Sequence, residues 1–199
     1  SVLPILQNIQ NTISLANLQA QIKDSTAIDT TLVGNSYPSK VGVFTDSASP
    51  YITPIVNFLV KNDASLLANL YLYYSNANNQ NIGIDYVLFT KQSKNKIGYQ
   101  IMFDATLDSV HAALEKVGAP NVTVVVSESG WPSEAEAVAA TVQNAGTYYR
   151  NLISHAKGGT PKRPNGLIEI YLYAMFDENQ KQGQEIQATF GLFRLDKSP

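Results

Sequence analysis

The sequence lacks cysteine altogether, which excludes disulfide bonds, thiolate catalysis and cysteine metal ligands but leaves the compartment open. It has only two histidines, and they do not form a cluster with metal-site spacing. Charged residues make up 15% of the chain and the net charge is −2, so no basic face indicates a nucleic-acid partner. No apolar run is long enough to cross a membrane. The 199 residues, 44% of them hydrophobic, are typical of a globular domain with a sizeable core.

Helical and strand-like patterns alternate along the whole chain, and no linker divides it, so we expect a single domain over 1–199. Apolar residues at helical spacing predict helices, and short apolar runs predict strands. The expected elements are helices over 4–21, 51–61, 100–117 and 135–156, and strands over 21–28, 66–74, 122–126 and 167–176. This order predicts an α/β fold with a parallel sheet. From the residues alone, a doubly wound sheet and part of an eight-stranded barrel both remain open.

In either architecture the active site lies at the C-terminal ends of the strands. The residues expected there are mainly carboxylates and aromatics: Asp29, Tyr71, Tyr73, Tyr74, Glu128, Trp131, Glu178 and Lys181. A carboxylate beside an aromatic face suits a sugar, because the sugar ring stacks on the aromatic group while the carboxylate meets the anomeric carbon. The pattern therefore favours carbohydrate chemistry.

Glu128 is the sharpest of these candidates. It follows the β-branched run at 122–126, and Gly130 then permits a tight turn. A carboxylate held there either performs chemistry or caps the next helix, and its position alone leaves both readings open. Glu178 and Lys181 lie three residues apart and are able to pair; position alone favours a solvated surface pair over a catalytic one.

Three other ionisable residues carry weaker expectations. Glu169 falls inside the last predicted strand, where we expect it to be buried and to need a partner. His111 and His155 fall on predicted outer helices, and we interpret both as packing or surface residues. The glycine-rich segment at 158–164 follows a helix rather than a strand, so it predicts a turn rather than a phosphate-binding loop.

The segment VVVSESGWPS at 124–133 closely resembles the signature of glycoside hydrolase family 17, the plant β-1,3-glucanases and their relatives. Other segments match the family in the same order along the chain: STAID at 25–29, GNSYP at 34–38, GGTPKRP at 158–164, AMFDENQK at 174–181, FGLF at 190–193 and DKSP at 196–199. The resemblance implies a (β/α)8 TIM barrel, of which this chain is the C-terminal part with about four βα units. It also implies that neither a cofactor nor a metal is needed.

The resemblance assigns roles to individual residues. Glu128 matches the nucleophile of a retaining endo-hydrolase of 1,3-β-glucan, and Glu178 and Lys181 match auxiliary residues beside it. The expected substrate-binding residues are Trp131, Tyr71, Tyr73, Tyr74 and Asp29. The implied setting is a secreted or vacuolar plant protein of the defence, pathogenesis-related type, with a 1,3-β-glucan as its partner and no membrane or nucleic acid.

The family also uses a general acid, a glutamate in an Asn-Glu motif at the end of the fourth barrel strand. No Asn-Glu dipeptide occurs in this chain. Retaining hydrolysis needs two carboxyl groups roughly 5–5.5 Å apart. We therefore expect the N-terminal half of the barrel to lie outside this sequence and to be a necessary partner. Residues 1–199 alone are expected to be inactive and poorly stable, since half a barrel leaves open sheet edges.

Three departures from the family pattern leave other readings open. Glu134 stands near a usual glycine, Leu72 at a usual proline and Gln187 at a usual acidic residue, for which Glu185 is a possible substitute. With the missing acid, they allow a catalytically inactive glucan-binding or allergen-like relative. An independent doubly wound domain with a small-molecule ligand is a third reading, although no glycine-rich turn follows a predicted strand.

Overall fold

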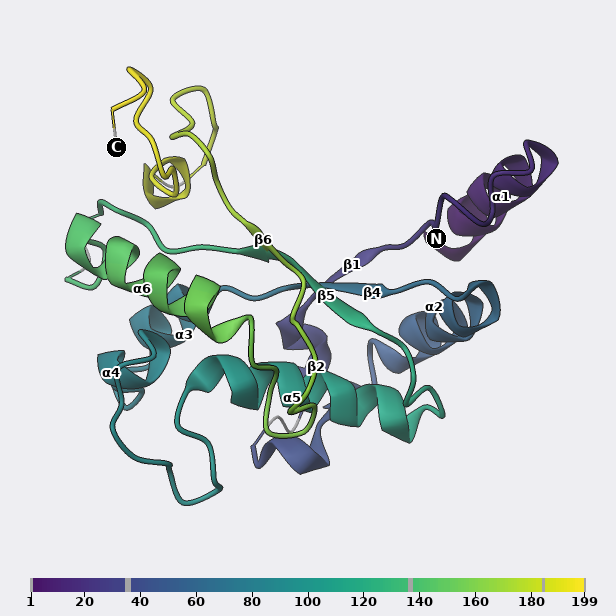
Figure 1. Cartoon of the computed structure of the whole chain (residues 1–199), viewed down its shortest axis with the longest axis horizontal. Helices are drawn as coiled ribbons and strands as arrows, with labels where there is room; N and C mark the ends of the chain where they lie inside the picture. The colour runs from purple at the N-terminus through teal and green to yellow at the C-terminus, as the bar shows by residue number, and fades with distance from the viewer. Residues whose placement is uncertain (1, 35–36, 136–137, 184, 199) are drawn as a thin grey trace. The chain divides into compact units, whose positions relative to one another are not determined.

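A computed structural model describes residues 2–34, 37–135, 138–183 and 185–198 (Figure 1). The chain divides into two compact units: Ser1–Asn69 with Thr106–Val125, and Leu70–Ala105 with Val126–Pro199. In both units helices alternate with strands that pair in parallel, so the predicted parallel α/β class is confirmed. Part of the GNSYP match, residues 35–36, and the Glu136 that follows Glu134 lie outside the described residues.

The first unit comprises the N-terminal elements of the chain and most of helix α5. Its elements are α1 (Val2–Leu15), β1 (Ala27–Asp29), the 3-10 helix η1 (Thr30–Leu32), β2 (Val33–Gly34), the 3-10 helix η2 (Ser39–Val41), β3 (Val43–Phe44), α2 (Ser49–Asn62), β4 (Leu66–Asn69) and most of α5 (Met102–Lys116). Strand β1 runs parallel to β4, with Ile28 opposite Ala68, whereas β2 and β3 form a short antiparallel pair. Helix α1 lies beside α2 (Figure 1).

The helix predicted at the start of the chain is confirmed, but it ends at Leu15 rather than at residue 21. Asn17 adopts a left-handed conformation with φ of 58°, and the N–H of Leu18 bonds back to the carbonyl of Ile13. These contacts satisfy the last carbonyls and stop the helix. The strand predicted over 21–28 is correspondingly shorter, because only Ala27–Asp29 pairs with β4.

The second unit holds the rest of the chain. Its elements are α3 (Leu72–Asn78), α4 (Ile84–Val87), the first residues of α5, β5 (Val124–Ser129) from Val126 onward, α6 (Val142–His155), β6 (Ile170–Leu172) and the 3-10 helix η3 (Glu185–Ala188). Strands β5 and β6 are parallel, with Val126 opposite Ile170. Helix α6 begins later than predicted because Thr141 caps it, its side chain accepting from the N–H of Asn144.

Two predicted elements differ most from the structure. The apolar run at 66–74 is not one strand: β4 ends at Asn69, and Leu72 already begins α3. The strand predicted over 167–176 is reduced to Ile170–Leu172. The helices predicted over 51–61 and 100–117 are confirmed, and the glycine-rich segment forms the predicted turn, in which the backbones of Thr160 and Arg163 bond to each other in both directions.

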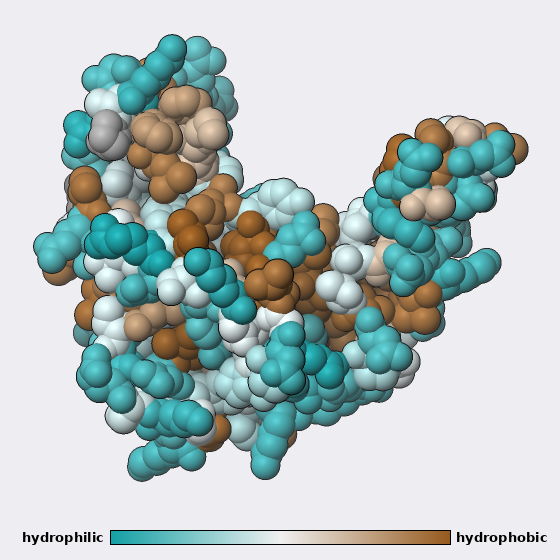
Figure 2. Space-filling view, in the orientation of Figure 1, coloured by the Kyte–Doolittle hydropathy of each residue, from teal (hydrophilic) through white to brown (hydrophobic). Residues whose placement is uncertain are grey.

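Strand β6 and the residues on both sides of it carry hydrophobic side chains on the surface of the second unit, gathered over β6 in Figure 2. Leu167 is 81% exposed, Tyr171 58% and Met175 64%. Glu169 is exposed here and not buried as predicted, because its carboxylate accepts a 2.9 Å hydrogen bond from Tyr171 at the surface. Among the described residues no helix has both the length and the apolarity to span a bilayer.

Candidate active site

Glu128 lies within the last part of β5 and not after it, because the strand continues through Ser129. The backbone explains this extension: the N–H of Leu70 donates to the carbonyl of Glu128 at 2.9 Å. The half-buried Glu128 side chain opens into a cavity of about 310 Å³. The other side chains that line the cavity are Tyr71, Tyr74, Tyr173, Lys181, Gln187 and Phe190.

The carboxylate of Glu128 is held by a phenol. The hydroxyl of Tyr71 donates a 2.7 Å hydrogen bond to Oε2 of Glu128. Burial, and then the adjacent carboxylate, raise the pKa of Tyr71 far above its usual range, so the phenol stays protonated and remains a donor. The alternative reading, in which Glu128 caps the next helix, does not hold because Thr141 caps α6.

Glu178 and Lys181 form a pair that is joined by a third residue. The ammonium group of Lys181 donates to Oε2 of Glu178 at 2.9 Å, and the hydroxyl of Tyr173 donates to the same oxygen while accepting from Lys181. The hydrogen bonds from Tyr173 and Lys181 lower the pKa of Glu178, and those with Tyr173 and Glu178 raise the pKa of Lys181. The cluster is therefore an anion and a cation bridged by a phenol.

Aromatic edges form the walls around Glu128. The ring of Tyr71 makes T-shaped contacts with Tyr173 at 6.1 Å, Phe190 at 5.6 Å and Tyr74 at 6.1 Å between centroids. Tyr173 and Phe190 were not among the residues predicted from the sequence. Phe190 is the first residue of the FGLF match, which was a usable signal, whereas Tyr173 looked like an ordinary strand residue.

Two predicted groove residues lie in the core instead. Trp131 is 0% exposed and Tyr73 1%, and neither lines the cavity. Their rings pack at right angles with centroids 5.3 Å apart, and the indole N–H of Trp131 donates to the carbonyl of Ala139 at 2.9 Å. This placement does not fit the expected stacking on a sugar; Trp131 anchors the loop after Glu128.

Asp29 belongs to the first unit. Its exposed carboxylate accepts from the N–H of Thr31 at 2.7 Å and so caps the 3-10 helix η1. A polar residue that caps a turn satisfies a backbone donor that would otherwise lack a partner. The described contact of Asp29 is thus structural.

The backbone after Glu128 is packed tightly against two other segments. A Cβ atom on Gly130 would collide with the carbonyl oxygen of Tyr173 and would lie 3.0 Å from both Phe190 and the Tyr149 hydroxyl. The hydroxyl of Tyr149 donates to the carbonyls of Tyr173 at 2.7 Å and Phe190 at 3.1 Å. Position 130 therefore needs glycine for the close approach of these segments, rather than for the tight turn that we expected there.

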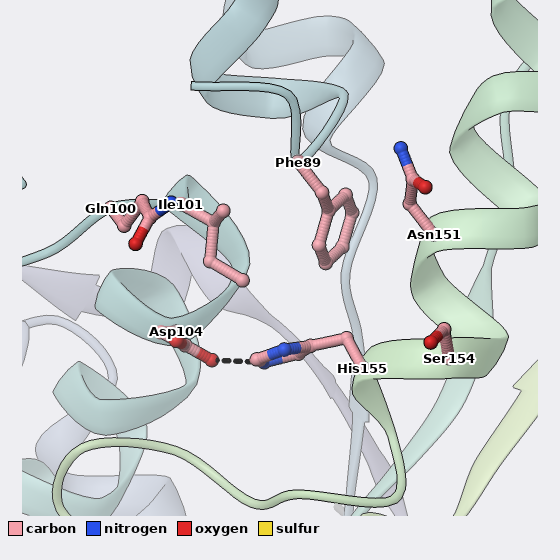
Figure 3. A pocket seen from close by; sticks show the side chains of 7 residues that line it. All are labelled: Phe89, Gln100, Ile101, Asp104, Asn151, Ser154 and His155. Carbon is pink, nitrogen blue, oxygen red and sulfur yellow. Dashed lines mark hydrogen bonds and ion pairs between the residues drawn. The ribbon is translucent and has the colours of Figure 1, made fainter. Parts of the chain in front are cut away.

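A second cavity, of about 330 Å³, lies between the start of α5 and the end of α6 (Figure 3). In it Nε2 of His155 is 2.6 Å from Oδ1 of Asp104, which is 7% exposed, and the ring of Phe89 lies 5.6 Å from the imidazole. His155 thus has the packing role that we expected, because it joins α6 to α5 through Asp104. His111 is buried. No group of three or more histidine, aspartate or glutamate side chains among the described residues is arranged to hold a metal ion.

The model of the family "Glycosyl hydrolases family 17" matches residues 1–199. A glucan endo-1,3-beta-glucosidase of Glycine max is 57% identical over 194 residues, covering 96% of this chain and 75% of that protein. One of Vitis vinifera is 53% identical over 197 residues, covering 96% of this chain and 57% of that protein.

Among solved structures, CJP38, a beta-1,3-glucanase and allergen of Cryptomeria japonica pollen, superposes with a TM-score of 0.94. It is 41% identical, and the match covers 98% of this chain but 62% of CJP38. The chain therefore spans between 57% and 75% of the length of these three relatives.

Proposed function

The chain belongs to glycosyl hydrolase family 17, and on that premise we propose that it takes part in the endo-hydrolysis of 1,3-β-glucans, with retention at the anomeric carbon and Glu128 as nucleophile. One observation carries the proposal. The carboxylate of Glu128 is held by Tyr71 at a cavity with aromatic walls, which is the combination that a glycosidase nucleophile requires.

The proposed first step is attack by Glu128 on the anomeric carbon. A bond forms between a carboxylate oxygen and that carbon, the glycosidic C–O bond breaks, and the leaving oxygen takes a proton from a general acid. Water then hydrolyses the glycosyl-enzyme ester. We propose that Oε1, the oxygen that Tyr71 does not bind, is the attacking atom.

Glu178, Lys181 and Tyr173 are proposed to have an auxiliary role. The cluster joins one anion to one cation, so it adds no net charge beside Glu128. Its hydrogen bonds fix the ring of Tyr173, which lines the cavity and contacts Tyr71. A fixed aromatic wall lowers the entropy that is lost when a sugar ring binds. We propose that Tyr71 and Tyr74, which also line the cavity, contact the glucan.

We also propose that the chain forms about four βα units, the C-terminal part of a (β/α)8 TIM barrel. The general acid would then belong to the N-terminal half, because retaining hydrolysis needs a second carboxyl and no Asn-Glu motif occurs here. The lengths of the relatives support this proposal. So do the exposed apolar side chains over β6, which a neighbouring strand would cover.

Laminarin, a soluble 1,3-β-glucan, is the substrate for the test. The chain is assayed alone and after mixing with the N-terminal half of the Vitis vinifera relative. New reducing ends measure cleavage, and NMR identifies which anomer is released first. We expect no cleavage by the chain alone. The mixture of the two halves, called the completed protein below, should cleave laminarin and release the β-anomer. In the completed protein Glu128→Gln should abolish turnover, whereas Asp85→Asn, at a side chain that is 50% exposed on the same unit and does not line the cavity, should leave it unchanged.

The outcomes separate the parts of the proposal. Turnover by the chain alone would refute the need for a second half. Turnover that survives Glu128→Gln, or release of the α-anomer first, would refute the assignment of the nucleophile. Such results would leave the family membership intact.

A second candidate is a glucan-binding relative without turnover, which one feature of the cavity favours. Gln187 lines the cavity at a position where the resemblance leads one to expect an acidic residue. Binding of laminarin oligosaccharides, measured by calorimetry, without any cleavage by the completed protein would favour this candidate.

For either function, we propose a secreted or vacuolar plant protein of the defence type. Fractionation of plant tissue with an antibody to the chain tests this location.

A further inference from the structure

Two adjacent tyrosines on α6, Tyr148 and Tyr149, direct their hydroxyls to different parts of the site. Both side chains are buried, at 0% and 6% exposure. A phenylalanine would fill either position with nearly the same volume, so what each tyrosine adds is one polar atom. A buried hydroxyl is costly unless it is hydrogen-bonded, which directs attention to what each of them binds.

The first hydroxyl contacts Ser129 at the end of β5, and Ser129 in turn binds Leu70, the residue before Tyr71. Oη of Tyr148 lies 2.7 Å from Oγ of Ser129, and Oγ of Ser129 donates to the carbonyl of Leu70 at 2.9 Å. Because the only hydroxyl hydrogen of Ser129 is used by Leu70, Tyr148 is the donor of the pair. Burial raises the pKa of Tyr148, so it keeps its proton.

This first chain of bonds ends at the nucleophile. Leu70, whose carbonyl Ser129 binds, donates its own N–H to the carbonyl of Glu128 at 2.9 Å. The next residue, Tyr71, binds the carboxylate of Glu128. The distance between the Tyr71 phenol and Glu128 therefore depends on a backbone segment that Tyr148 holds through Ser129.

The second hydroxyl reaches the loop after Glu128 and the walls of the cavity. Oη of Tyr149 accepts from the N–H of Trp131 at 3.3 Å, and its single hydrogen is shared between the carbonyls of Tyr173 and Phe190. The side chains of Tyr173 and Phe190 both line the cavity. One oxygen thus joins three backbone segments, and burial raises its pKa to about 12, which keeps it protonated.

We propose that Tyr148 and Tyr149 are positioning residues for the reaction: Tyr148 sets the place of Glu128 against Tyr71, and Tyr149 sets the aromatic walls. Neither hydroxyl lies among the groups that line the cavity, so both act through others. The proposal rests on the proposed function of Glu128. Its physical basis is that a misplacement of about 1 Å at a reacting group costs up to about 100-fold in rate.

The roles proposed for Tyr148 and Tyr149 predict different kinetic changes. In the completed protein, Tyr148→Phe should lower kcat on laminarin by roughly 10-fold and change KM less than Tyr149→Phe does, because Tyr173 and Phe190 keep their bonds to Tyr149. Tyr149→Phe should raise KM several-fold and lower kcat as well, because it frees the walls. Tyr51→Phe, which removes a hydroxyl from a side chain 73% exposed on α2, is the matched control and should change neither constant.

Amide hydrogen exchange, followed by NMR, provides a readout that does not need turnover. Tyr148→Phe should accelerate exchange at the Leu70 N–H, and Tyr149→Phe should accelerate it at the Trp131 N–H, each relative to Tyr51→Phe. If the proposed function is wrong, the completed wild-type protein itself is inactive, and so are both phenylalanine variants. The exchange measurement then decides alone. Unchanged exchange at both amides overturns the positioning roles of Tyr148 and Tyr149, and accelerated exchange supports them.

A merely structural role gives another pattern. If both phenylalanine variants melt at lower temperature but retain wild-type kcat and KM at temperatures where they are folded, the positioning proposal is overturned. The expected result is the split between kcat and KM described above, in variants that are folded by circular dichroism at the assay temperature.

Discussion

The phenol of Tyr71 donates a 2.7 Å hydrogen bond to Oε2 of Glu128, although the two residues are 57 positions apart in the sequence. The bond is reinforced by the backbone, since the residue before Tyr71 donates its N–H to the carbonyl of Glu128. A charge-assisted bond of this length is short and directional. The orientation of the carboxylate is therefore set before any substrate arrives.

The first prediction concerns this bond. Tyr71→Phe removes the donor and leaves the ring, so we expect kcat on laminarin to fall roughly 10- to 100-fold in the completed protein, as for loss of a hydrogen bond to a charged group worth about 1.5–3 kcal/mol. Steady-state kinetics measures the change. Tyr51→Phe again serves as the control, and a Tyr71→Phe enzyme with wild-type kcat would show that Glu128 needs no phenol to orient it.

The second prediction concerns Glu178 and pH. Because Tyr173 and Lys181 lower the pKa of Glu178, its contribution to stability is fully present above the ordinary value of 4.5 and is lost as pH falls through the lowered pKa. The raised pKa of Lys181 makes its contribution present below 10.5 and lost as pH rises through the raised pKa. The cluster therefore stabilises the fold between these two limits.

Thermal melts of wild type and Glu178→Gln across this range provide the measurement. At pH 7 the variant should melt at a lower temperature, by an amount equivalent to about 1 kcal/mol or less because the pair is exposed. The difference should shrink as pH falls below 4.5. Glu185→Gln, an exposed substitution of the same kind, is the control. A difference that persists unchanged at low pH would contradict the assignment of the effect to ionised Glu178.

Part of this structure could be read from the sequence, and the reason is local. The β-branched run at 124–126 forms the core of β5, and the apolar stripe at Phe103, Leu107, Val110 and Leu114 is the buried face of α5. Strand and helix periodicity depend on neighbouring residues, so a sequence pattern is sufficient. The motif around Glu128 likewise lies in one continuous segment.

Other features depend on partners that are distant in the sequence. The run LLANLYLYY has the aromatic and apolar composition of a strand, but the backbone turns at Tyr71, and Leu72 begins a helix. Trp131 belongs to the segment VVVSESGWPS that carries Glu128, yet its indole packs on Tyr73 and Tyr148 and does not line the cavity. The place of Tyr173 in the cavity wall arises from its ring contact with Tyr71, which lies far away in the sequence and which no spacing rule indicates.

The third prediction concerns the closely packed loop after Glu128. Gly130→Ala places a methyl group against the carbonyl of Tyr173, so the backbone must shift. We expect a loss of about 1–3 kcal/mol in the free energy of unfolding, as for overpacking, together with reduced activity because the shift reaches Glu128. Urea denaturation measures the stability. Gly166→Ala is the matched control, because an added Cβ there has no atom within 4 Å, and equal losses in the two variants would contradict a steric cause.

The fourth prediction concerns the tie between α5 and α6. Asp104 is buried and its carboxylate lies 2.6 Å from Nε2 of His155, so Asp104→Asn or His155→Gln weakens a buried polar contact (Figure 3). Each variant should lose about 1–3 kcal/mol in the free energy of unfolding, and the double variant should lose less than the sum, because the two residues share one interaction. Asp85→Asn, at a 4.0 Å pair with Lys91 whose aspartate is 50% exposed, should cost about 1 kcal/mol or less. Urea denaturation of all four variants measures these values, and additive losses for Asp104 and His155 would show that the two side chains are not coupled.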